Sequence, residues 1–141
     1  MPLDDHNLNA AITGADSPEW SVRATAGRQL AAAALTDDVL AVVLRLLLDP
    51  DDTAVTQDTA EALLARGDGV GLRCVLLALS RATSPCTMDE LGAALDCTPL
   101  WMTDEGTNRL TEHLRELATD PDAGVRTEAA GILGTLRPHT S

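Results

Sequence analysis

Apolar residues recur along this chain at the three- and four-residue spacing of an α-helix. Residues 36–48 show it most plainly, because Leu40, Val43, Leu44 and Leu47 follow one another at that spacing. Side chains so spaced share one face of a helix, whereas those of a half-buried strand would alternate. The pattern predicts an all-α chain of about eight helices, near residues 3–13, 18–34, 36–48, 53–65, 70–81, 87–97, 107–118 and 121–136.

Polar residues and glycines mark where these helices begin and end. Thr36 precedes one helix as an N-cap, and Thr87 followed by Glu90 has the form of a capping box. Gly67 ends the preceding helix in a short turn, as glycine does at helix C-termini. Residues 96–106 are the least regular segment. Because the loops are short, we expect four pairs of antiparallel helices.

One phrase occurs three times, at residues 22–30, 55–63 and 125–133. Each copy has Val first, small residues four and five positions later, and Leu eight positions later. An acidic turn that contains proline precedes each copy. The first two copies are 33 residues apart, and the second and third are 70 apart, which is two periods of 35. A fixed period of this size predicts stacked structural repeats.

These pairs resemble HEAT repeats, in which an Asp-Pro turn leads into a second helix that opens with Val-Arg. Residues 120–126 match that pattern closely, residues 16–23 match it with one inserted residue, and residues 49–56 have Thr56 in place of the arginine. The pair at 70–97 lacks the phrase. The resemblance implies a right-handed α-α superhelix of about four antiparallel helix pairs. The chain would be one domain over 1–141, with repeats at 3–34, 36–66, 69–97 and 104–137.

The resemblance also implies a structural role for the turn aspartate and the arginine that follows Val. In the family these residues commonly form polar contacts from one repeat to the next. Carried over, this ladder would consist of Asp16, Asp49 and Asp120 with Arg23 and Arg126, and Thr56 would interrupt it once. Such residues hold the stack together rather than bind a ligand.

The charge of the chain narrows its choice of partners. The formal net charge is −12, and all ten basic residues are arginine. Nucleic acids and anionic membranes require clustered basic residues, so neither is expected to bind. Many of the acids stand at helix starts, where they complement the helix dipole. A basic protein partner is compatible with this charge.

The cysteines and the N-terminal residues indicate a cytoplasmic, reducing location. Cys74, Cys86 and Cys97 are odd in number and have no zinc or redox spacing. Cys74 lies in an apolar run and is expected to be a small core residue. The first residues show no secretory signal.

No residue pattern points to catalysis, a metal or a cofactor. Some HEAT-like enzymes carry paired His-Glu motifs, but this chain has only the reversed Glu112-His113. The glycine-rich residues 67–71 follow a helix rather than a strand, so we interpret them as a helix stop and a turn. An enzyme with a metal or cofactor in a helical stack is the least favoured function, and no cofactor is predicted.

Two surfaces are therefore candidates for binding another protein. One is the exposed side of the second helices with the acidic turn beside it, and the other is the irregular Trp-containing segment. An aromatic residue flanked by Leu and Met suits an interface hot spot, although Trp101 could instead fold back to cover the third pair. Trp20 is expected to pack between the first two pairs. The candidate binding residues are Arg23, Arg28, Asp58, Glu61, Asp49, Asp51, Asp52, Leu100, Trp101 and Met102.

The favoured function is thus a non-enzymatic module for protein–protein interaction. Its sharper form is an acidic inhibitor or immunity-type protein that blocks a basic partner, such as a nucleic-acid-cleaving toxin. The alternative is a generic scaffold, adaptor or accessory subunit. The sequence leaves the two open, together with the oligomeric state, because the ends of so short a stack could pair with another copy.

Overall fold

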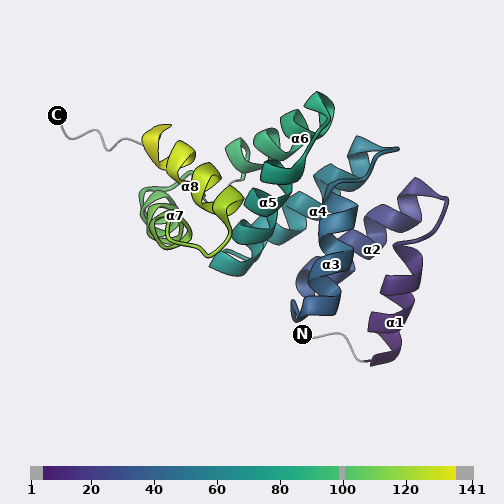
Figure 1. The fold of residues 1–141 in the computed structure, drawn as a ribbon. Helices are drawn as coiled ribbons and strands as arrows, with labels where there is room; N and C mark the ends of the chain where they lie inside the picture. The colour runs from purple at the N-terminus through teal and green to yellow at the C-terminus, as the bar shows by residue number, and fades with distance from the viewer. Residues whose placement is uncertain (1–4, 99–100, 136–141) are drawn as a thin grey trace.

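The computed structural model describes residues 5–98 and 101–135, and eight α-helices are the main elements within them. The eight helices follow one another along an elongated molecule, from α1 at one end to α7 and α8 at the other (Figure 1). Their bounds are α1 Asp5–Gly14, α2 Trp20–Ala32, α3 Asp37–Leu47, α4 Thr53–Ala65, α5 Gly69–Arg81, α6 Pro85–Asp96, α7 Asp104–Leu117 and α8 Ala123–Thr135.

Short polar side chains cap several of these helices. The oxygens of Thr36, Asp52, Asp68 and Thr103 each accept a hydrogen bond from a backbone N–H in the first turn of α3, α4, α5 and α7. These bonds satisfy donors that have no partner inside the helix. The expected turn before α5 is confirmed, because Gly67 has a φ of 73°, which residues other than glycine rarely adopt.

The predicted capping box at Thr87 is wrong. The helix begins two residues earlier, with Ser84 as its N-cap and Pro85 in its first turn, and Thr87 is buried inside that turn. A proline in the first turn has no N–H group that would lack an acceptor, and its ring fixes φ at a helical value. It therefore extends the helix ahead of the threonine that the pattern had marked as its start.

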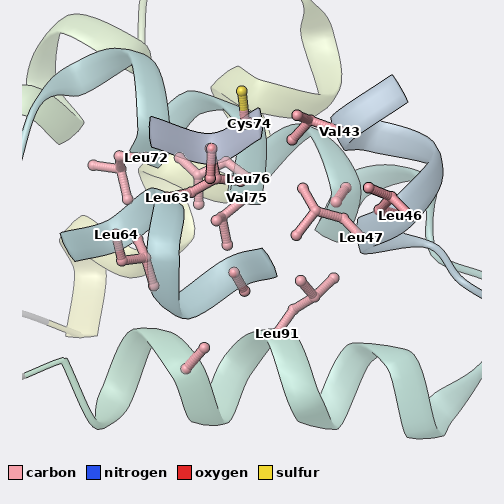
Figure 2. Close-up of a cluster of buried hydrophobic side chains, with 14 of the residues drawn as sticks. Val43, Leu46, Leu47, Leu63, Leu64, Leu72, Cys74, Val75, Leu76 and Leu91 are labelled. Atoms are coloured by element: carbon pink, nitrogen blue, oxygen red, sulfur yellow. The ribbon is translucent and has the colours of Figure 1, made fainter. Parts of the chain in front are cut away.

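Leucine, valine and alanine fill the interior. Figure 2 shows the centre of the core, where buried side chains of α3, α4, α5 and α6 meet. Leu47, Leu63, Leu76 and Leu91 are fully buried there. Cys74 joins this core as predicted, and its burial raises the pKa of its thiol to about 11. A thiol with that pKa stays protonated near neutral pH and behaves as an apolar side chain.

Two rows of helices pack side by side through most of the molecule. One row holds α2, α4 and α6, and the other holds α3, α5 and α7. A close approach lies between α2 and α4, where a Cβ added at Gly27 would overlap the hydroxyl oxygen of Thr59. The last helix departs from this order, because α8 packs against α5 and α7 rather than against α6.

The prediction for Trp20 is wrong. Trp20 is the first residue of α2, and 49% of its surface stays exposed, so it is not buried between the first two helix pairs. The close contact of this helix is made instead by buried Gly27, which lies against Thr59 of α4. A bulky indole would hold α2 and α4 apart at that distance.

Candidate functional site

The predicted polar ladder is confirmed at its first step. Arg23 of α2 donates from Nε to Asp49 Oδ2 at 2.8 Å, and both side chains are buried. Its Nη1 donates to the carbonyl oxygens of Ser17 and Pro18. The hydrogen bond from Arg23 to Asp49 raises the pKa of the guanidinium, so it stays charged. This buried pair joins the turn before α4 to α2.

The later steps of the ladder differ from the prediction. The carboxylate of Asp120 accepts two hydrogen bonds from Arg73 of α5, at 2.8 and 3.0 Å. Arg126 donates to the backbone oxygens of Asp120 and Pro121 instead of to a carboxylate. At the expected interruption, the buried hydroxyl of Thr56 has no hydrogen-bond partner. Asp16 contacts Arg45, and both side chains are exposed.

The predicted residues on the second helices are already paired with one another. Arg28 of α2 donates to Asp58 of α4 at 2.6 Å, and Gln57 donates to Glu61 at 3.2 Å within α4. These side chains are largely exposed, so their bonds compete with water and are weak. They form a mixed surface over α2 and α4, with one arginine, two acids and a neutral amide.

The three predicted acids of the turn before α4 have different surroundings. Asp49 is buried and accepts from Arg23 and from the backbone N–H groups of Asp51 and Asp52. Asp52 caps α4, whereas Asp51 is exposed. A polar hollow of about 610 Å³ lies beside them and includes Arg81. Asp51 is therefore the acid of this turn that is most available to a partner.

The irregular segment between α6 and α7 is divided between core and surface. Trp101 is buried with 6% of its surface exposed, as the covering alternative required, and Met102 is 65% exposed. The ring of Trp101 meets that of His113 edge to face, with centroids 6.4 Å apart. Both Trp101 Nε1 and His113 Nε2 are buried without a hydrogen-bond partner. Leu100, the third predicted residue of this segment, lies outside the described residues.

A pocket of about 330 Å³ lies next to Trp101, and we call it the α6–α8 groove. It exists because α8 packs on α5, which leaves the facing sides of α6 and α8 without substantial contact with each other. Figure 1 shows α8 crossing beside α5 while α6 stands apart. The apolar lining of the groove includes Leu79 of α5, Leu95 of α6, Leu110 of α7, Ile132 of α8, Trp101 and Met102.

Gly92 of α6 also lines this groove. A Cβ added at Gly92 would meet no atom within 4 Å, so no neighbour requires a glycine there. A glycine inside a helix lowers stability by roughly 0.5–1 kcal/mol relative to alanine. The absence of a side chain leaves the groove open at this point.

The charged side chains of the groove have one sign. Asp96 stands on the α6 wall and Glu128 on the α8 wall, and no basic residue among the described ones lines it. The surrounding apolar surface lowers the local dielectric and strengthens their attraction for a cation. The groove therefore combines an apolar floor with acids on two opposite walls.

The pattern of the sequence did not reveal this groove. Trp101 and Met102 were predicted because an aromatic residue flanked by Leu and Met stands in an irregular segment. Leu95, Ile132 and Gly92 look like ordinary helix positions, and only the packing of α8 on α5 brings them together. The missing repeat phrase at 70–97 was the one signal that the packing changes there.

No model of a known protein family, no curated protein and no solved structure matches this chain. Among the described residues, no group of three His, Cys, Asp or Glu side chains is placed to hold a metal ion. None of the helices in that part of the chain has the length and apolar character that crossing a bilayer requires.

Proposed function

We propose that this protein is a non-enzymatic module that binds another protein through the α6–α8 groove. The groove itself carries the proposal, because it joins an apolar floor to exposed Met102 and to two unpaired carboxylates. A buried apolar anchor site with a polar rim is the usual anatomy of a protein interface.

The architecture that we propose for this module is a HEAT-like stack. Three features support it: the threefold phrase, the Arg23–Asp49 pair between successive helix pairs, and the row of α2, α4 and α6. In such stacks each repeat contacts its neighbours, and the second helices line the binding face. Here the row ends at α6, and the groove occupies the place that follows.

The partner that we propose is a basic protein. The chain has a formal net charge of −12, and the groove adds Asp96 and Glu128 at the point of contact. Opposite charge accelerates association and makes it sensitive to salt. An inhibitor of a basic protein is the form of the function that uses this charge most fully, with Asp51 as a further contact. An adaptor would need no excess of acid.

Capture of host proteins by the tagged full-length chain tests this function. We expect a basic protein to be retained at about 0.05 M salt and released at about 0.5 M. Gly92→Leu, which places a side chain in the groove, should lose that protein. Ala93→Leu, a change at an exposed position of the same helix outside the groove, should keep it. Equal capture by both variants would contradict the proposed site, and a salt-resistant acidic partner would contradict the inhibitor.

A further inference from the structure

We infer that the occupant of the α6–α8 groove is an amphipathic α-helix of the partner, with basic residues beside its apolar face. This inference rests on the proposed function and adds the conformation and charge of the bound segment. Three observations support it: the position of the groove in the row of helices, the open space over Gly92, and the acids on opposite walls.

A helix suits this groove better than an extended peptide does. Backbone N–H and C=O groups that enter an apolar groove must keep hydrogen-bond partners. An extended peptide finds them at a sheet edge, but the walls here are helices with their backbone bonds already made. A helix satisfies its own backbone and presents only side chains.

The walls present the side-chain spacing that helix packing requires. On α8 the groove residues are Glu128, Ile132 and Thr135, at intervals of four and three, and on α6 they include Gly92 and Leu95, three apart. Such rows are the ridges and grooves between which a neighbouring helix fits. In the preceding steps of the row, α4 lies on α2 and α6 lies on α4. A partner helix would take the next place, which α8 leaves free.

Gly92 sets how closely that helix can approach. Within the molecule, Gly27 permits the close contact of α2 with α4, because any Cβ there would overlap Thr59. Gly92 offers the same absence of a side chain on α6, but a Cβ added there would meet no other part of the described chain within 4 Å. A helix seated in the groove would fill that space with its own side chains.

Asp96 and Glu128 determine the charge of the occupant. They stand on opposite walls, so a helix whose apolar face meets Leu95 and Ile132 would direct its two flanks toward them. Long basic side chains suit this position, because their stems cover apolar surface while their charges reach the rim. The bound helix therefore needs Lys or Arg on both sides of an apolar stripe.

A synthetic peptide of leucine and lysine, about 18 residues long with leucine at helical spacing, is the probe. Its control has the same composition with leucines at every second position where possible, which favours a strand. Both are titrated into the isotope-labelled full chain, and the indole N–H signals of Trp101 and Trp20 are followed. Trp20→Phe assigns the two signals. The helicity of each bound peptide is measured by labelling the peptide instead.

We expect the helical-spacing peptide to bind at least about tenfold more tightly than its control and to become helical. The Trp101 signal should shift while that of Trp20 stays in place. Gly92→Leu should weaken binding by about tenfold, and Ala93→Leu by less than about twofold. Asp96→Asn with Glu128→Gln should reduce the affinity and its salt dependence, whereas Asp89→Asn with Glu105→Gln, outside the groove, should change both less.

Two results would overturn this inference. Equal binding to Gly92→Leu and Ala93→Leu would mean that the peptide is attracted by net charge alone. Tighter binding of the alternating peptide, or binding without helix formation, would mean that the groove takes an extended segment. If host capture still depended on Gly92 in that case, the proposed function would stand and only the helical occupant would fail.

Discussion

A glycine lies at the contact between α2 and α4 and another at the gap between α6 and α8, but their surroundings differ. Each has a glycine on a second helix, Gly27 in one and Gly92 in the other. At Gly27 the missing side chain is replaced by Thr59 of the adjacent helix, so the interior is closely packed. At Gly92 no atom of the described chain takes that place. The first glycine permits close packing within the fold, whereas the second leaves an open space over α6.

The difference also extends to the polar contacts. In the first half, buried Arg23 and Asp49 join α2 to the turn before α4. In the second half, Asp120 pairs with Arg73 of α5, and α8 also packs against α5. The change of arginine partner and the change of helix neighbour occur together. The two halves should therefore respond differently when these contacts are altered.

Asp49→Ala should have the largest effect on stability. It leaves the guanidinium of Arg23 buried without its carboxylate and removes the acceptor for two backbone N–H groups. Breaking a buried ion pair from one side costs about 3–5 kcal/mol of unfolding free energy. The exposed pair of Asp16 with Arg45 provides the control, since Asp16→Ala should cost less than about 1 kcal/mol. Similar losses in urea unfolding of both variants would contradict the buried role of Asp49.

Gly27→Ala should destabilise the protein by less. Overpacking against Thr59 costs about 1–3 kcal/mol, and the better helix propensity of alanine returns up to about 1 kcal/mol. We therefore expect a net loss of about 0.5–2 kcal/mol in chemical unfolding. A gain in stability would show that α2 and α4 are not closely packed here.

Gly92→Ala should act in the opposite direction. The added Cβ meets nothing within 4 Å, so only helix propensity changes. The free energy of unfolding should rise by about 0.5–1 kcal/mol, measured in the same urea series as Gly27→Ala. A loss of stability would mean that the space over Gly92 is filled in the folded protein, and the contrast between the two glycines would disappear.

The smallest effect is expected from pH at the Asp120–Arg73 pair. Hydrogen bonds from Arg73 lower the pKa of Asp120, against the opposing effect of burial. A folded pKa below the unfolded value stabilises the fold above about pH 4, and this contribution is lost as the pH falls further. Asp120→Asn should remove part of that acid sensitivity in unfolding measured between about pH 6 and pH 3. An unchanged pH profile would show that the pair is not linked to folding.

Much of the fold could be predicted from local pattern. The helix over 53–65 agrees with α4, and Thr36, Gly67 and Cys74 have the roles expected of them. Local chemistry decides such features, because caps, turns and apolar faces depend on residues close in sequence. The pairing of Asp49 with Arg23 was expected only because the resemblance to HEAT repeats implied it, and the contact is present.

The features that could not be predicted depend on competition between local signals or on packing between distant helices. Thr87 resembles a cap until Pro85 is considered as the earlier helix start. Trp20 lies at the first position of α2 and is exposed, and its apolar character alone does not indicate on which side of the helix it lies. The groove requires knowing that α8 packs against α5 and not against α6. The missing repeat phrase at 70–97 marks a change in the pattern but does not indicate where α8 lies.

The most direct test of the binding groove is the retention of host protein by Gly92→Leu relative to Ala93→Leu, with unfolding measured on the same samples. We predict that Gly92→Leu is at least as stable as the unmodified chain and yet loses its partner. Ala93→Leu should keep it. A stable Gly92→Leu variant that retains the partner as well as Ala93→Leu would contradict the claim that the partner occupies the space between α6 and α8.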